Sequence, residues 1–511
     1  MQAFFGVSDL KKKLLLNSVS GTALYAVTLV VTFVISPFLV KTLGNSNYGI
    51  WEVILSIVGY MGVMDLGVGP ALVRFVSTSH SSGDRGELAR IVSSATIFFL
   101  VIGTLAASAL AALSAFPDLI TKTGSESSVY ITTVLILFAV NVGINFPLTV
   151  FTGTLMGLQR HYLLNLTRIV LAIGNALAVY FILVKFPLSG LITLVALQLA
   201  SNLIQMVVFG SAVCFDKDIP RLSLRNSSMK TMRNLWAYGM KSIAMMLASR
   251  LQVQSMPFVI GSVLGLDKIV YFVMPRRLME YARGMSTAIG FPLTPYFASF
   301  YGRNDHIALQ KSWLKTSLAL QVVSNAMPVV LLFCGVPFIS QWLGAEYADA
   351  GKWVMYVLVI GLAAESLVPN AASVLMAANR HGRMSYLLLF IATACVPSAI
   401  VGAKLWGLVG VAVACCAATA AGSAISLIMA CKELHISPFQ YFRESTLPLL
   451  APLMILAVLM WTAGVFLPVS GYVKIILQVL IGGSGYVIAI WALVLDQEKR
   501  SRILQRLVGV W

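Results

Sequence analysis

The feature that most constrains this chain is a succession of long apolar runs, each close to the length that crosses a bilayer. A spanning helix needs about 20 mainly apolar residues, and these runs are too long, and alternate too little, to be strands. Charged residues make up only 11% of the 511 residues, against about 25% in soluble globular chains. So few charges could not cover the surface of a soluble fold, so lipid must surround most of the chain.

The runs predict an all-α integral membrane protein of about 14 transmembrane helices. The spans are expected near residues 14–40, 49–77, 88–115, 129–158, 162–184, 188–215, 236–265, 269–300, 308–342, 352–378, 384–403, 406–431, 447–467 and 474–495.

Lysine and arginine predict the orientation of these spans. If the N-terminus is cytoplasmic, the inner segments hold 23 of these residues and the outer loops hold seven, one lysine per loop. This is the bias of the positive-inside rule, and it places both termini in the cytoplasm. The net charge of +17 is then mainly an orientation signal, and no nucleic-acid partner is expected. The short outer loops leave no room for an external catalytic domain.

Two parts of the chain resemble each other at a spacing near 220 residues. The matched positions, in order, are Pro37 and Pro257, Pro147 and Pro369, the segments 155–161 and 375–381, and Lys185 and Lys404. An even number of spans in each part preserves orientation, so the sequence predicts two six-helix bundles as parallel repeats plus two C-terminal helices. The expected boundaries are 1–215 for the first bundle, 216–235 for a cytoplasmic linker, 236–432 for the second bundle, and 433–511 for the last two spans with an amphipathic cytoplasmic tail.

Charged residues inside the spans are the candidate site. A charge at the centre of a spanning helix costs about 2.5–3.5 kcal/mol on insertion scales, so those that are kept are functional candidates. Arg276, Glu280 and Arg283 share one helical face, whereas Arg250 and Lys241 lie in the preceding span. Because these bases outnumber nearby acids, an anionic ligand is expected, bound by Arg250, Arg276, Arg283 and Lys241.

Three acids are candidates for coupling transport to an ion gradient: Asp65, Glu280 and Glu365. Asp65 precedes Gly67, Gly69 and Pro70, where the backbone is able to bend. Each acid has two open interpretations, one as a carrier of H⁺ or Na⁺ and one as half of an ion pair that holds helices together.

No catalytic residue, cofactor or metal site is predicted. The chain has no G-x-x-x-x-G-K-[ST] sequence for binding ATP phosphates. The five histidines lie in or beside inner loops, and the six cysteines lie in spans without the paired spacing of zinc ligands.

Two segments carry a resemblance to a known family. Residues 43–51 (LGNSNYGIW) are similar to the L-G-x-x-x-Y-G-x-[WY] segment of bacterial polysaccharide flippases of the Wzx type, and residues 65–74 (DLGVGPALVR) resemble their D-x-G-[LV]-x-x-[AS]-[LI]-[VI]-R segment. Together with the span count and the repeat, the chain resembles that O-antigen and exopolysaccharide flippase family of the multidrug/oligosaccharidyl-lipid/polysaccharide exporter superfamily.

The resemblance implies that the chain moves undecaprenyl-diphosphate-linked oligosaccharide from the cytoplasmic to the outer leaflet of the bacterial inner membrane, through a central cavity with alternating access. It implies a monomer that works beside a polysaccharide polymerase and a chain-length regulator, with the last two spans forming a groove for the polyprenyl tail. Three alternatives stay open: a multidrug or cation antiporter of the same superfamily, a lipid II flippase, and a membrane enzyme of polysaccharide synthesis.

Overall fold

The computed structural model describes residues 2–116, 128–186, 190–216, 219, 226–290, 293–303 and 305–495. All regular elements in these ranges are helices, and eleven are long and apolar enough to cross a membrane. The predicted all-α integral membrane fold is therefore confirmed. One of the eleven, Gly382–Glu433, contains two of the expected spans, and another, Leu16–Asp65, covers nearly all of the first expected span and part of the second. The count of 14 therefore stays a prediction.

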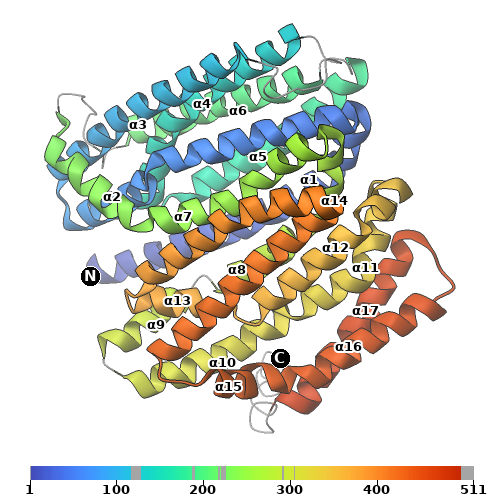
Figure 1. Ribbon diagram of the computed structural model, residues 1–511. Coiled ribbons are helices and arrows are strands. Elements are labelled where there is room, and N and C mark those ends of the chain that lie inside the picture. The colour runs from blue at the N-terminus through green and yellow to red at the C-terminus, as the bar shows by residue number, and fades with distance from the viewer. Residues whose placement is uncertain are drawn as a thin grey trace. The chain divides into compact units, whose positions relative to one another are not determined.

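The chain divides into two compact units, and the first extends from Met1 to Phe258. Figure 1 shows α3, α4 and α6 side by side in this unit, and α1 packs along α5. The core joins buried side chains of α2, α3 and α4, such as Leu72, Phe99 and Phe146. The elements are α1 (Gln2–Met61), η1 (Gly62–Asp65), α2 (Val68–Ser82), α3 (Arg85–Leu113), α4 (Ser128–Gly157), α5 (His161–Lys185), α6 (Gly190–Cys214) and α7 (Met229–Val263).

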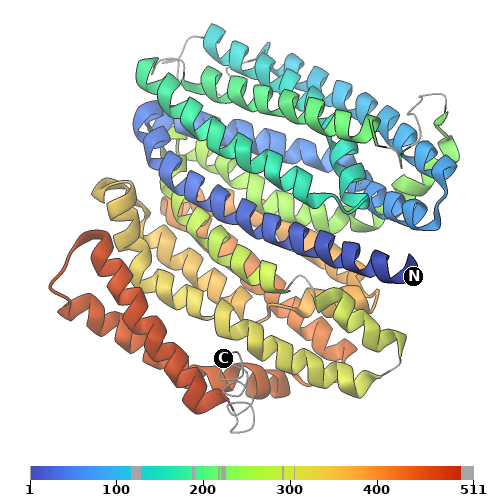
Figure 2. The same ribbon diagram turned by 180° about the vertical axis from the view of Figure 1, so that it is seen from behind.

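The second unit extends from Val259 to Trp511. In it α12 packs on α8, α11 and α14, and α16 lies beside α17, as both Figure 1 and the reverse view in Figure 2 show. The elements are η5 (Leu266–Lys268), α8 (Ile269–Gly290), α9 (Leu293–Gly302), α10 (His306–Ser324), α11 (Ala326–Trp342), α12 (Ala345–Ser366), α13 (Ala371–Ala377), α14 (His381–Glu433), α15 (Pro438–Tyr441), η6 (Phe442–Thr446), α16 (Leu447–Phe466), α17 (Gly471–Ala489) and η7 (Ile490–Val494).

Local backbone features recur between the two units at the spacing that the sequence suggests. Gly44 interrupts α1 with φ 73 and ψ 165, and Gly265 precedes η5 with φ 112 and ψ 153. Gln159 and Asn379, each two residues before a helix start, are both left-handed, with φ 58 and 53. These conformations favour glycine or asparagine. They support an internal repeat, while the domain boundaries and the relation between the units stay predictions.

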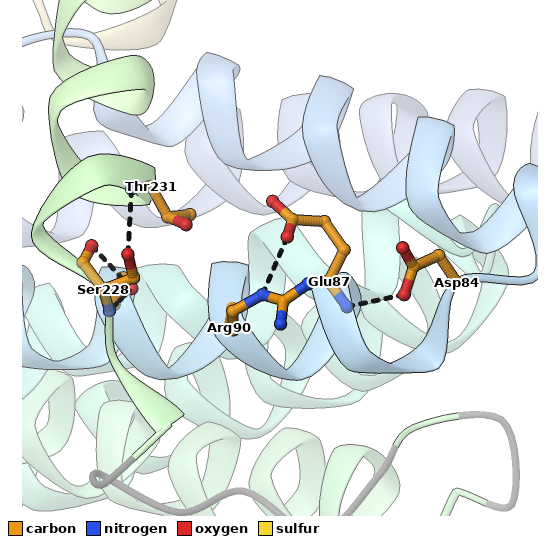
Figure 3. A network of polar contacts seen from close by, with 6 residues as sticks. Asp84, Glu87, Arg90, Ser228 and Thr231 are labelled. Carbon is orange, nitrogen blue, oxygen red and sulfur yellow. Dashed lines mark hydrogen bonds and ion pairs between the residues drawn. The ribbon is translucent and has the colours of Figure 1, made fainter.

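Side-chain caps mark the polar ends of the spans. At the start of α3, the Asp84 carboxylate accepts a hydrogen bond from the Glu87 N–H at 2.8 Å, and the Arg90 Nε donates to Glu87 at 2.9 Å (Figure 3). The Ser228 N–H lies just before α7 and donates to the hydroxyl of Ser94, a residue of α3, at 3.0 Å. Asp305 caps α10 as Asp84 caps α3. These contacts satisfy N–H groups that a helix start leaves unpaired.

The surface of α5 has the character of a lipid-facing helix. Its large apolar side chains are exposed at helical spacing, which in water would create an aggregation-prone patch. The exposed residues are Leu166, Val170, Ile173, Leu177, Phe181 and Val184. In a bilayer the same stripe needs no protein partner. The predicted amphipathic tail at 496–511 and eight of the 20 residues of the predicted linker, 217–218 and 220–225, lie outside the described residues.

Candidate functional site

Asp65 lies at a sharp break in the backbone, about midway along the second expected span. It ends the short helix η1, and the next two residues are left-handed, Leu66 with φ 51 and Gly67 with φ 74. The Gly67 N–H donates to the Asp65 Oδ1 at 2.6 Å. The glycines after Asp65 therefore permit the bend that the sequence predicts, and the bend gives the carboxylate a backbone donor.

The face of α7 that carries Arg250 and Gln254 lies against the chain just before this break. A Cβ added to Gly59 would collide with the Gln254 side-chain amide, and one added to Gly62 would come 3.9 Å from the Arg250 Nη2. Arg250 also attracts the Asp65 carboxylate electrostatically. Arg250 and Gln254 thus share a face, as their spacing indicates, and that face lies against the segment just before the break within the first unit.

Helix α8 carries the largest group of charges in any expected span, which is why it is not among the eleven apolar helices. The Arg276 Nε lies 3.2 Å from the Glu280 Oε1, one helical turn away. The Arg276 side chain is 15% exposed and that of Glu280 is 44% exposed. Glu280 thus offsets the charge of Arg276 within one helix, as the i, i+4 spacing predicts.

Arg283, one turn further along α8, reaches a different helix. Its Nε and Nη2 both donate to the Glu365 Oε2, at 2.9 Å and 2.6 Å. Glu365 is the next-to-last residue of α12, close to the break that separates α12 from α13. The two-donor contact joins residues 82 positions apart, and spacing within one helix could not reveal it.

These contacts change the expected electrostatics of the site. The sequence suggests a stripe on α8 with net positive charge, but Glu365 from α12 offsets Arg283. Two of the three predicted acids form an ion pair with an arginine of their own unit, Glu280 with Arg276 and Glu365 with Arg283. Asp65 has a weaker electrostatic attraction to Arg250. The arginines are therefore shared with internal carboxylates. Lys241 lies on α7, and its side chain is outside the described part of the structure.

The sequence analysis did not identify one acidic residue inside an expected span. Glu52 lies on α1 inside the second expected span, and it is only 8% exposed. The signal that identified the other acids, a carboxylate inside an apolar run, applies to it equally. Among the described residues, no group of three or more His, Cys, Asp or Glu side chains is arranged to hold a metal ion.

A buried polar network supports the helix break beside Glu365. The Gln321 Nε2 on α10 donates to the Leu367 carbonyl at 2.8 Å and to the Tyr441 hydroxyl at 3.1 Å. The Gln321 Oε1 accepts from the Thr446 hydroxyl at 3.0 Å. On the other side of the break, the Asn370 Oδ1 accepts from the Ser317 hydroxyl at 2.8 Å. The network replaces backbone hydrogen bonds that the break removes, as a membrane interior requires.

Replacing Gln321 with alanine is expected to destabilise the fold by about 2–3 kcal/mol, because several buried polar groups would lose their partners together. The unfolding midpoint of the purified protein in detergent measures the effect. Gln205→Ala is the matched control, since the Gln205 amide makes only long hydrogen bonds of 3.4 and 3.5 Å and should shift the midpoint little. Equal midpoints for the two variants would contradict a supporting role for the network.

Comparison with known proteins identifies the family. Residues 14–301 match the model of a family described as "Polysaccharide biosynthesis protein". The chain is 22% identical over 349 residues to a putative O-antigen transporter of Shigella flexneri. The aligned region covers 68% of this chain and 80% of that protein. The chain is also 22% identical over 341 residues to an uncharacterized membrane protein, EpsK, of Bacillus subtilis (strain 168), over 66% of each chain.

Solved structures show the same fold at low identity. The lipid II flippase MurJ, in an inward closed conformation, superposes with a TM-score of 0.69 at 14% identity over 95% of this chain and 99% of that one. An inward-facing multidrug resistance transporter of the MATE family superposes with a TM-score of 0.68 at 12% identity over 81% and 94%.

The predicted resemblance is confirmed by these matches, and the protein is a transporter, not an enzyme. The family match covers more than half of the sequence. The chain therefore belongs to the polysaccharide biosynthesis protein family of multi-pass membrane transporters.

Proposed function

We propose that this protein is a flippase that moves undecaprenyl-diphosphate-linked oligosaccharide from the cytoplasmic to the outer leaflet, for a cell-surface polysaccharide such as O-antigen, capsule or exopolysaccharide. The observation that carries the proposal is the set of arginines inside the spans, in a chain whose relatives include a protein named as an O-antigen transporter. A diphosphate is the part of such a substrate that needs these arginines.

The chemistry of the arginines favours a phosphate ligand. A guanidinium presents a planar fork of donors that matches carboxylate or phosphate oxygens in pairs. Arg283 already directs two donors of its guanidinium at one oxygen of Glu365, which supports an oxyanion as the ligand at this position. We assign the diphosphate to Arg250, Arg276 and Arg283, with Lys241 as a further cation.

The proposed orientation is supported by the charge bias of the loops, and the rest of the proposed setting is what the resemblance to polysaccharide flippases implies. The protein lies in the bacterial inner membrane with both termini in the cytoplasm, works as a monomer, and hands its product to a polysaccharide polymerase and a chain-length regulator. Its access alternates between the two leaflets. The polyprenyl tail stays in lipid, along the last two spans, α16 and α17.

Reconstitution in liposomes tests the cargo. An undecaprenyl-diphosphate oligosaccharide should become accessible to an external glycan-modifying enzyme when the wild-type protein is present, and it should stay protected in empty liposomes. The same preparation should not expel a cationic dye. Dye efflux without glycan movement would identify a multidrug exporter instead. The arginines would then have only a structural role, in ion pairs.

We further propose that Asp65, Glu280 or Glu365 couples transport to an H⁺ or Na⁺ gradient. At least one of the variants Asp65→Asn, Glu280→Gln and Glu365→Gln should then lose the acceleration that an imposed gradient gives to the wild type. Rates measured with and without each gradient, at equal protein content, check this prediction. If all three variants respond to both gradients as the wild type does, none of these acids is the coupling site.

A further inference from the structure

Arg168 lies on the side of α5 that faces the rest of the first unit. At about 3.6 residues per turn, it lies within about 60° of Leu164, Val179 and Leu183, which are all buried. The exposed apolar stripe of α5 lies at least about 140° away around the helix. An arginine near the end of a span often extends along the lipid-facing side to the membrane interface, but Arg168 lies on the opposite side. The surrounding lipid therefore does not explain why a charge is kept here.

The polar residues before and after Arg168 on this side of α5 both have partners. One turn before it, the Asn165 Nδ2 donates to the Ser20 hydroxyl of α1 at 3.0 Å. Two turns after it, the Asn175 Nδ2 donates to the Ser201 hydroxyl of α6 at 2.8 Å. These contacts hold α5 against α1 near its start and against α6 further along, with Arg168 between them.

Arg168 itself makes no hydrogen bond and no ion pair with any residue in the described part of the chain. Two hydrogen bonds between α1 and α5 each join residues 145 positions apart, so the helices run parallel and Ala23 of α1 lies level with Arg168. An alanine side chain offers no acceptor. Arg168 is partly buried, and a guanidinium that leaves water without an anionic partner is costly. The position therefore favours an anionic ligand.

We propose that Arg168 binds the phosphate of a lipid near the cytoplasmic end of α5, and that the diphosphate of the cargo binds there first. The inference rests on the proposed function and adds a loading step to it. Arg168 is seven residues beyond His161, the first residue of α5, or about 10 Å along the helix. A lipid already carries its phosphate at the membrane interface, so the long arginine side chain is able to meet it, whereas a dissolved anion would have to leave water.

Two features favour a phosphate at Arg168. A guanidinium matches a pair of phosphate oxygens with its planar fork, and the neighbouring amides of Asn165 and Asn175 carry no negative charge to repel it. Arg283 must release Glu365 before both of its donors can contact another anion. Among the described residues Arg168 has no such contact to break, so the diphosphate is expected to bind there at a lower concentration.

Chemical modification of single arginines tests the site directly. Phenylglyoxal attacks free guanidinium groups, and peptide mass spectrometry of the purified full-length protein measures the rate at each arginine. Geranylgeranyl diphosphate, at about ten times its dissociation constant, should slow the modification of Arg168 roughly tenfold, because only the unoccupied site reacts. Arg303, an exposed arginine outside the expected spans, should react at the same rate with and without the lipid.

Two further lipids identify the source of the phosphate. Geranylgeraniol has the same tail without a phosphate and should not protect Arg168. Phosphatidylglycerol carries a single phosphate and should protect Arg168 only weakly, since the cargo offers two phosphates. Protection by phosphatidylglycerol alone would assign the site to a bilayer phospholipid and would overturn the loading step.

Substitution of Arg168 tests the loading step. Arg168→Gln should need roughly tenfold more lipid-linked oligosaccharide for half-maximal translocation, the effect of losing one charge-assisted contact, whereas its maximal rate should change little. Arg168→Lys keeps the charge without the planar fork and should fall between Arg168→Gln and the wild type. Lys185→Gln is the matched control, because it removes a cation from the last residue of the same helix and should leave both values unchanged.

The outcomes separate the phosphate site from the proposed function. Equal modification of Arg168 with and without geranylgeranyl diphosphate and phosphatidylglycerol, or equal protection by geranylgeraniol, would overturn the site. This measurement uses the wild type, so it stands even if Arg168→Gln does not fold. Intact glycan translocation alongside that result would leave the proposed function in place. Protection of Arg168 in a protein that moves no lipid-linked glycan would overturn the proposed function and keep the phosphate site.

Discussion

Replacing Arg283 with alanine will slow translocation of lipid-linked oligosaccharide about 100-fold, because two charge-assisted hydrogen bonds of about 1.5 kcal/mol each are lost. Two causes act in the same direction. The variant loses both donors that now contact Glu365 and that we assign to the diphosphate. It also leaves the Glu365 carboxylate without its arginine, next to the site that we propose for the negatively charged diphosphate.

The liposome assay described above measures this loss at equal amounts of reconstituted protein. Arg283→Lys should fall between the wild type and the alanine variant, because an ammonium keeps the charge and loses the planar fork. Arg303→Ala removes an exposed arginine outside the expected spans and should leave the rate unchanged. A wild-type rate in Arg283→Ala would show that the pair with Glu365 is structural and that the diphosphate binds elsewhere.

Replacing Gly239 with alanine will destabilise the first unit by about 3 kcal/mol, at the upper end of the usual cost of overpacking. A Cβ at this position would come 2.6 Å from the Leu66 carbonyl oxygen and 2.7 Å from that of Gly67. Both are backbone atoms at the break beside Asp65, and they cannot turn aside as a flexible side chain does. Arg74 stacks 4.5 Å from the centre of the neighbouring Tyr238 ring, which ties α2 to α7 close to the same contact.

The unfolding midpoint in detergent and the yield of folded protein measure this effect. Gly174→Ala is the matched control, because nothing lies within 4 Å of a Cβ added there. Alanine in that helix interior should be neutral or should stabilise the fold by about 0.5–1 kcal/mol. If Gly239→Ala is as stable as Gly174→Ala, then α7 does not depend on a close approach to the break.

Local patterns in the sequence predicted much of this architecture. The length of the apolar runs identified the helices, and the glycines after Asp65 predicted a bend that the structure places at Leu66 and Gly67. Pro369 likewise lies in the gap between α12 and α13. The contact between Arg276 and Glu280 follows from i, i+4 spacing. In each case the cause lies within a few residues of the effect.

Longer-range features could not be predicted in the same way. Glu365 comes to Arg283 because α12 packs against α8, and no sequence periodicity encodes which helices are neighbours. The network around Gln321 joins α10, the α12–α13 break and the start of α16, and its members are uncharged. The ends of the spans were also difficult to predict. Helix α14 continues across a kink at Trp406 and Gly407, where the sequence analysis expected two separate spans.

The most direct test of the account is to find where the diphosphate binds. A lipid-linked oligosaccharide with a photoreactive group beside its diphosphate should label α8 around residues 276–283 and the end of α12. Excess unlabelled lipid diphosphate should suppress the labelling, and Arg283→Ala should abolish it. Labelling confined to other helices, unchanged by the competitor and by Arg283→Ala, would contradict the assignment of the diphosphate to these arginines.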